Sequence, residues 1–88
     1  MTQNAINTTP TDIIDEMWAM MCQNANLPED KAVYVLKEVS KIFGVSMSTV
    51  RRWSVSGNLR SWLLGPRKRV VAVQELKRYL MEQANHAD

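Results

Sequence analysis

The chain has 88 residues, of which 45% are apolar and 23% are charged, and its formal net charge is +2. This length leaves room for one small core and excludes the architectures of most large enzymes. The single cysteine, Cys22, cannot form an internal disulfide, which suits a reducing compartment. The longest apolar run covers residues 17–22, far fewer than the roughly 20 residues of a membrane-spanning helix, and the chain does not begin with a signal-peptide pattern. We therefore expect a cytoplasmic protein with no membrane span.

The charge is divided unevenly along the chain. Residues 1–30 contain five acids and no lysine or arginine, whereas residues 31–88 contain eleven bases and four acids. From Arg51 to Arg69 there are six bases and no acid. A stretch of one sign repels itself in a compact fold unless solvent or a polyanion compensates it. The basic stretch is therefore either a solvated surface or a site for a polyanion.

The N-terminal third predicts a tail and one helix. Residues 1–11 are polar and lack apolar periodicity, which predicts a flexible tail. Apolar residues then recur at helical spacing to about residue 24, so residues 12–30 are predicted as an acidic amphipathic helix and a linker. The apolar stripe of this helix is too large to remain in water, so it packs either on its own domain or on a homo-oligomer or protein partner. The stripe consists of Ile13, Ile14, Met17, Trp18 and Met21.

A pair of helices joined by a tight turn is predicted next. Residues 32–36 are apolar and partly β-branched, which is typical of a short strand or of the start of a helix. A helix over residues 37–43 ends at Gly44, because glycine tolerates the left-handed conformation of a helix exit. Ser46 is placed to cap a second helix over residues 47–56.

A hairpin and a last helix complete the predicted domain, which spans residues 31–83. Residues 59–64 and 67–73 are predicted as two strands around a two-residue Gly-Pro turn. An amphipathic helix follows over residues 74–83, and residues 84–88 are predicted as a second flexible tail. Cys22 is expected to be a small packing residue of the N-terminal helix.

The second helix of the pair has a predicted exposed face that suits DNA. If its large apolar residues, Val50 and Trp53, face the core, the opposite face presents small and basic side chains. Arginine pairs bidentately with guanine edges or with phosphate, and hydroxyls and N–H groups at a helix start suit phosphate. The residues predicted to contact DNA from this helix are Ser46, Ser48, Thr49, Arg51, Arg52 and Val55.

The hairpin is a second basic element beside this helix. A basic loop of this kind can lie along phosphates or enter an adjacent minor groove. Trp62 is predicted to lie opposite Arg69, where it either forms a cation–π pair or is buried. The residues predicted to contact DNA from the hairpin are Arg60, Arg67, Lys68 and Arg69.

The run from Glu38 to Trp53, EVSKIFGVSMSTVRRW, is followed by GNL at residues 57–59 and by the RKR of the hairpin. Together these segments resemble the winged helix-turn-helix of MerR-like and excisionase-like DNA-binding proteins. The resemblance covers about residues 34–81 and is most specific at GVS and TVRRW.

The resemblance implies a mainly α fold with a small β-hairpin, to which the N-terminal helix is an addition. It implies that the helix over residues 47–56 is a recognition helix for the DNA major groove. It also implies that residues 59–73 form a wing on the DNA backbone or the minor groove.

The sequence therefore predicts a sequence-specific double-stranded DNA-binding protein. We expect a small transcriptional regulator of phage or mobile-element type, associated with the nucleoid of a prokaryotic host. One alternative is an excisionase that bends DNA beside an integrase, and another is an adaptor or antirepressor that acts through its N-terminal helix. We expect no enzyme, cofactor or metal, because one histidine and one cysteine make no ligand cluster and no phosphate-loop or nucleophile motif is present.

Overall fold

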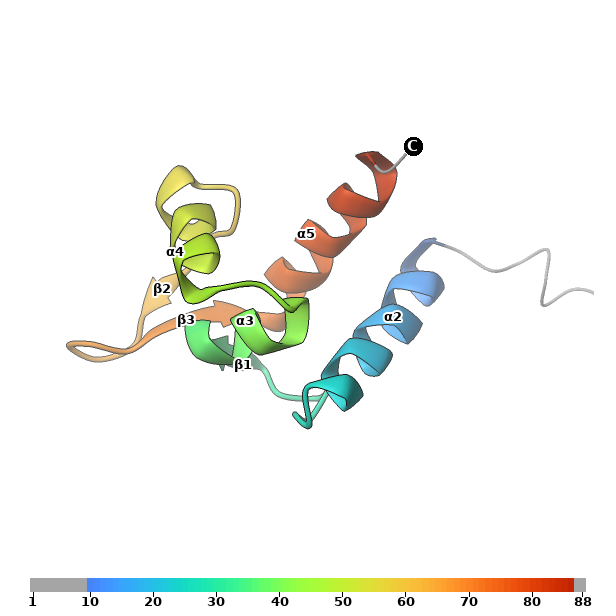
Figure 1. Ribbon diagram of the computed structural model, residues 1–88, viewed down its shortest axis with the longest axis horizontal. Helices are drawn as coiled ribbons and strands as arrows, with labels where there is room; N and C mark the ends of the chain where they lie inside the picture. Colours follow the sequence, from blue (N-terminus) through green and yellow to red (C-terminus); the bar gives the residue numbers. More distant parts are fainter. Residues whose placement is uncertain (1–9, 87–88) are drawn as a thin grey trace, which may run out of the picture.

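The computed structural model describes residues 10–86, in which four helices pack around a three-stranded antiparallel sheet (Figure 1). In chain order the elements are α2 (Pro10–Asn24), β1 (Val33–Val35), α3 (Leu36–Phe43), α4 (Met47–Ser56), β2 (Trp62–Leu63), β3 (Arg69–Ala72) and α5 (Val73–His86). Helices α2 and α5 pack together at one end of the molecule, and the β2–β3 hairpin projects from the other end (Figure 1). The predicted fold class, mainly helical with a small sheet and an additional N-terminal helix, is confirmed.

The two terminal helices extend further than the sequence predicted. Helix α2 begins at Pro10 rather than residue 12, because the first turn of a helix does not need the N–H that proline lacks. Helix α5 continues to His86, since no glycine or proline stops it at residue 83. The predicted tails are therefore wrong for residues 10–11 and 84–86, and their remainders lie outside the described residues.

Helices α3 and α4 form the expected pair joined by a tight turn. Gly44 ends α3 in the left-handed region, with φ +68°. The Ser46 hydroxyl accepts a hydrogen bond of 3.2 Å from the Thr49 N–H and so caps α4. Gly57, with φ +86°, ends α4 where the sequence predicted. These caps fix the length of α4 and the direction in which it leaves the turn.

Strand β3 lies at the centre of the sheet, between β1 and β2. The segment 32–36 contains the short strand that was one of its two predicted forms, with Tyr34 opposite Val71 of β3. Strands β2 and β3 are shorter than predicted, and β2 is an edge strand of two residues. The sheet thus places the hairpin next to the helix pair, because β1 leads directly into α3.

The register of the hairpin differs from the sequence prediction. Trp62 lies opposite Val70, not opposite Arg69. The Leu64 N–H donates to the Lys68 carbonyl, so the connecting loop holds three residues rather than two and the register shifts by one. Trp62 is 46% exposed, so the predicted full burial is wrong. The observed register also removes the cross-strand position opposite Arg69 on which the predicted cation–π pair depended.

An aromatic cluster fills the space between α2, the sheet and the helix pair. The Trp18 ring meets Tyr34 edge-on, with the ring centroids 5.4 Å apart, and its indole N–H donates to the Glu29 carbonyl. Phe43 packs against Trp53, with their centroids 5.7 Å apart, and Trp53 in turn packs against Tyr79 at 4.8 Å. Trp53 is therefore the core anchor of α4 that the sequence predicted.

The apolar stripe of α2 packs mainly on the chain's own domain. Ile14 and Trp18 are buried, Met17 and Met21 are partly buried, and only Ile13 of the stripe is exposed. The expected alternative, an oligomer or partner contact through the whole stripe, is therefore wrong for its buried members. Cys22 is also buried there as the expected packing residue, and this burial raises the pKa of its thiol.

Candidate nucleic-acid interface

The face of α4 that points away from the core carries most of the predicted contact residues. Val50 is fully buried against α3, which turns Ser48, Arg52 and Val55 outward. All three are exposed, and no acidic residue occurs in α4. The wheel deduced from the sequence is thus the one that the helix adopts, and its outer face is small and positive.

The first turn of α4 is exposed, and the side chain of Ser46 caps it. The hydroxyls of Ser46 and Thr49 lie 3.0 Å apart, so they bond to each other in addition to the cap itself. The N–H groups in the first turn of α4 carry the positive end of the helix dipole, which suits a phosphate. Phosphate contacts by these two residues remain a prediction.

The wing, residues 59–73, carries the second group of predicted contacts. Arg67, Lys68 and Arg69 are exposed at its loop and at the start of β3. Arg60 is exposed before β2, where its backbone N–H donates to the Glu75 carboxylate over 2.9 Å. It is separated from the other three bases, because it lies at the base of the wing rather than at its loop.

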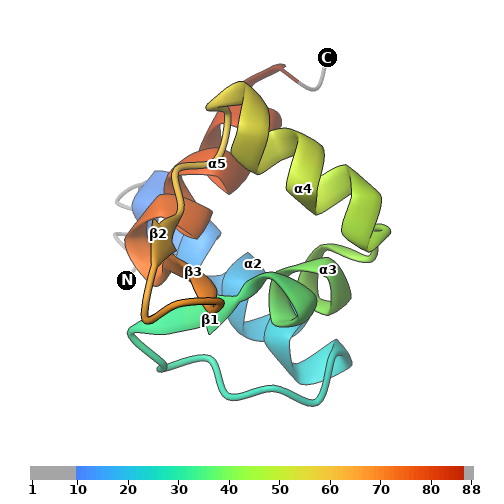
Figure 2. The ribbon, with the colours of Figure 1, turned by 90° about the vertical axis from the view of Figure 1, so that its left-hand side faces the viewer.

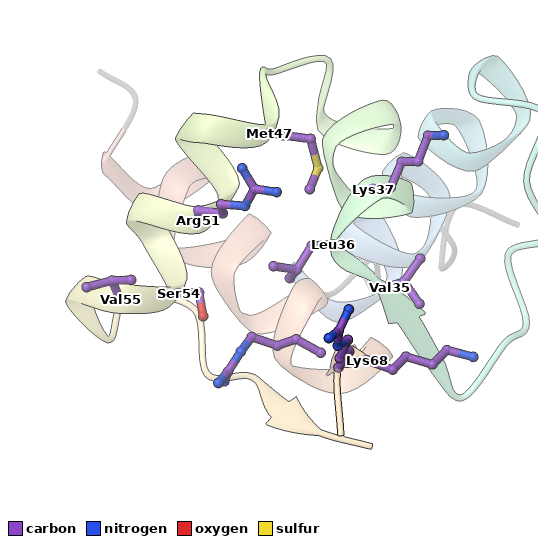
Figure 3. A pocket seen from close by; sticks show the side chains of 10 residues that line it. Val35, Leu36, Lys37, Met47, Arg51, Ser54, Val55 and Lys68 are labelled. Atoms are coloured by element: carbon purple, nitrogen blue, oxygen red, sulfur yellow. The ribbon is translucent and has the colours of Figure 1, made fainter. Parts of the chain in front are cut away.

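A hollow of about 600 Å³ separates α4 from the wing. Figure 3 shows Arg51 of α4 and Lys68 of the wing extending along its walls, and Figure 2 shows how α4 and the hairpin flank the molecule on this side. We call this hollow the basic groove; it is lined by Val35, Leu36, Lys37, Met47, Arg51, Ser54, Val55, Arg67, Lys68 and Arg69. Five of these ten residues are basic and none is acidic, so the groove suits a polyanion.

The basic groove brings some predicted residues together and leaves others apart. It includes Arg51, Val55 and three bases of the wing, whereas Ser48, Arg52 and Arg60 lie outside it. Lys37, at the start of α3, belongs to the groove and was missed by the sequence analysis. The sequence signal for Lys37 was its place in a helix pair that contains few acids. The sequence does not show that Lys37 lies beside the wing, because this depends on the pairing of β1 with β3.

Hydrogen bonds fasten the wing to α4. The hydroxyls of Ser54 in α4 and Ser61 in the wing lie 2.6 Å apart, and the Arg69 guanidinium donates to the Ser61 oxygen over 3.0 Å. This chain joins the two basic elements directly. It also orients Arg69 along the groove, since one of its nitrogens is held by Ser61.

Helix α5 holds the loop that connects α4 to the wing. Arg78 donates to the carboxylate of Glu75 and to the Asn58 carbonyl, and Glu75 accepts the Arg60 N–H as described above. The hydrogen bonds from Arg78 hold the pKa of Glu75 below its ordinary value, and the Arg60 N–H adds to this effect against the partial burial of the carboxylate. The loop is thus anchored by a charged network rather than by apolar packing alone.

A second carboxylate fixes the start of α3 in a similar way. Burial raises the pKa of Glu38, but the hydrogen bonds from the Lys31 ammonium at 2.7 Å and from the Val35 N–H at 3.0 Å outweigh burial, so its pKa is lowered. Val35 and the adjoining Leu36 line the groove, so this contact positions one of its walls.

The match to a known family agrees with this arrangement. A comparison with models of protein families matches residues 33–84 to the helix-turn-helix domain. The chain belongs to the helix-turn-helix domain family. The matched residues run from β1 almost to the end of α5, and α2 lies outside the helix-turn-helix domain. The resemblance to excisionase-like and MerR-like proteins is thereby confirmed.

A helix-turn-helix domain implies DNA binding, and such domains are typically not enzymes. The chain matches no curated protein and no solved structure. Residues 10–86 contain no group of three or more histidine, cysteine or carboxylate side chains that could hold a metal ion. None of the helices described is long and apolar enough to cross a membrane.

Proposed function

We propose that the protein binds double-stranded DNA sequence-specifically and acts as a small transcriptional regulator. In this proposal α4 is the recognition helix in the major groove, and the wing lies on the backbone or in the adjacent minor groove. The observation that carries the proposal is the acid-free basic groove between α4 and the wing.

The outer face of α4 fits the requirements of base recognition. A major groove about 12 Å wide admits a helix, and the small Ser48 side chain permits close approach. Arg52 projects from the same outer face, outside the basic groove, so its guanidinium is free for a bidentate contact with a guanine edge. Val55 supplies an exposed apolar surface of the kind that contacts a thymine methyl group.

The basic groove fits the DNA backbone. One sugar-phosphate strand separates a major groove from the neighbouring minor groove, so a protein that occupies both must let this strand pass between its two elements. Lys37 and Arg51 on one side, and three bases of the wing on the other, would neutralise the phosphates of that strand. Arg51 and Arg52 therefore take different roles, with Arg51 on phosphate and Arg52 on bases.

We favour regulation of transcription over the excisionase role because occupying an operator requires only the surface described above. An excisionase would also need a contact with an integrase, for which α2 is the element outside the family match. The adaptor reading is weakened because α2 uses most of its apolar stripe within its own domain.

The test is selection from a pool of random and genomic duplex fragments at about physiological salt, followed by sequencing of the bound fraction and footprinting. Enrichment of one motif near promoters is expected. Enrichment of adjacent direct repeats at a recombination site would replace the regulator with the excisionase. Binding without any motif, or no binding, would contradict sequence-specific recognition and turn attention to a protein partner of α2.

A further inference from the structure

The wing carries exposed apolar side chains that lie outside the basic groove. Trp62, Leu63 and Leu64 are consecutive, and their exposed fractions are 46%, 59% and 56%. They belong to the edge strand β2 and to the start of the loop, and none of the three lines the groove. We call these three residues the wing edge. Large apolar side chains that adjoin one another on a surface favour contact with another molecule.

Helix α2 carries a second exposed apolar group, on the side opposite its buried residues. Ile13, Met17 and Met20 follow one another at spacings of four and three residues, which places them on one face of the helix. Ile13 and Met20 are 47% and 62% exposed, and Met17 is partly buried. Glu16 is exposed beside them, three residues after Ile13. We call these four residues the outer face of α2.

The charges around the two apolar groups are opposite. Residues 1–30 contain five acids and no lysine or arginine, whereas residues 51–69 contain six bases and no acid. A contact between two wing edges would bring bases together, and a contact between two outer faces of α2 would bring acids together. A contact between a wing edge and an outer face of α2 pairs opposite charges and covers apolar side chains on both sides. Electrostatic complementarity therefore selects the unlike pairing.

The two groups cannot meet within one molecule. Helix α2 packs with α5 at one end of the structure, and the hairpin projects from the other end (Figure 1). The unlike pairing therefore requires a second copy of the chain. Such a contact is heterologous, because each copy contributes a different surface to it.

We propose that the wing edge of one copy binds the outer face of α2 on a second copy. In this contact Ile13 and Met20 cover the leucines of the wing edge, and Glu16 faces the bases of the wing. The inference goes beyond the proposed function, and it uses no residue that lines the basic groove. It also assigns a role to α2, which lies outside the family match. The surfaces are small, so we expect a dissociation constant on the order of 100 μM.

The first measurement is sedimentation equilibrium of the protein without DNA, in about 50 mM salt and from about 20 to about 500 μM. The average mass of the wild type should rise above that of one chain as the concentration increases. Leu63→Ser/Leu64→Ser and Ile13→Ser/Met20→Ser should each weaken the association by at least about tenfold. The matched control is Val33→Ser, which changes an apolar residue of β1 that is 38% exposed and belongs to neither surface.

Mixing the two double variants separates an unlike pairing from a like one. Each variant retains the surface that the other has lost. An equimolar mixture should therefore associate about as strongly as one wild-type contact allows, although neither variant does so alone. A mixture that associates no better than its components overturns the proposal, because the contact would then join like surfaces.

A second measurement does not depend on the folding of any variant. Unlabelled wild-type protein is added to a small amount of ¹⁵N-labelled wild type, and the N–H resonances are followed by NMR. The indole resonance of Trp62 and the backbone resonances of Ile13 and Met20 should shift together. The indole of Trp18, which is buried and bonded to the Glu29 carbonyl, serves as the internal control and should not move. Shifts at only one of the two surfaces overturn the proposal.

The outcomes are independent of DNA binding, because no DNA is present in either measurement. A wild-type protein that stays monomeric over the whole concentration range overturns the contact and leaves the proposed function untouched. A double variant of either surface that associates as strongly as the wild type also overturns it. Failure to select a duplex motif, with the unlike pairing intact, would contradict the proposed function alone.

Discussion

Two regions of this molecule carry runs of large apolar residues, and they use them in opposite ways. Helix α2 turns Ile14 and Trp18 into the domain, where they are 3% and 1% exposed, whereas Trp62, Leu63 and Leu64 of the wing are 46%, 59% and 56% exposed. The charges in the two regions differ as well. Helix α2 carries acidic side chains, and the wing carries basic ones. The apolar residues of α2 therefore contribute to the stability of the core, whereas those of the wing remain partly exposed to solvent.

The largest expected effect tests the α2 side of this comparison. Trp18→Ala should lower the free energy of unfolding by about 3 to 5 kcal/mol, since it removes a buried ring that packs on Tyr34. Leu63→Ala, on the exposed side, should change it by no more than about 0.5 kcal/mol. Both are measured by urea unfolding at neutral pH. Equal losses for the two variants would remove the distinction between the regions.

The next largest effect separates the roles of α4 and the wing. Arg52→Ala should reduce discrimination between the selected site and a site with one changed base pair by about 1 to 3 kcal/mol. Lys68→Ala should instead weaken all sequences alike and flatten the slope of log affinity against log salt by about one unit. Binding isotherms on both duplexes at several salt concentrations measure these changes. If the two variants behave identically, α4 and the wing do not have separate roles.

A related variant tests the residue that only the structure revealed. Lys37→Gln should resemble Lys68→Ala, with a salt slope flatter by about one unit and unchanged sequence preference. Lys41→Gln, on the same helix but outside the basic groove, is the matched control. A salt slope that Lys41→Gln alters and Lys37→Gln does not would place the phosphate path elsewhere.

The smallest expected effect concerns the anchor of the connecting loop and depends on pH. Because the pKa of Glu75 in the fold lies below its ordinary value of 4.5, its contribution is complete above pH 4.5 and is lost as the pH falls through the folded pKa. Glu75→Gln should therefore be less stable than the wild type by about 1 kcal/mol at pH 7, and the two should converge as the pH falls below 4.5. Unfolding curves from pH 7 to pH 3 measure this. A constant difference over that range would mean that the Glu75 charge does not matter.

The parts of the fold that local chemistry determines could be predicted from the sequence. Gly44, Ser46 and Gly57 defined α4 to the residue, because each position needs a specific backbone conformation or cap. The inward orientation of Val50 was inferred because Val50 and Trp53 are the large apolar residues that α4 can pack on α3, and the structure confirms that Val50 is buried. The outward orientation of Ser48 and Arg52 then followed without any knowledge of the tertiary fold.

The parts that depend on distant contacts could not be predicted in the same way. The register of Trp62 was wrong by one residue, because a Gly-Pro pair fits the first two positions of a three-residue loop as well as a two-residue turn. Lys37 was missed, since its place in the basic groove depends on β1 joining the sheet. The sequence did not decide whether the apolar stripe of α2 packs on its own domain or on a partner. The packing of Trp18 on Tyr34 shows that it packs on its own domain.

The link between Ser54, Ser61 and Arg69 sets the distance between α4 and the wing before any DNA is present. In the proposed complex the protein therefore requires a fixed separation between the DNA segment that α4 contacts and the segment that the wing contacts. Each inserted base pair moves the next contact by about 3.4 Å and rotates it by about 35° around the duplex. A target site with one base pair added between its major-groove and minor-groove segments would thus be out of helical phase with the protein, although every base in each segment was correct.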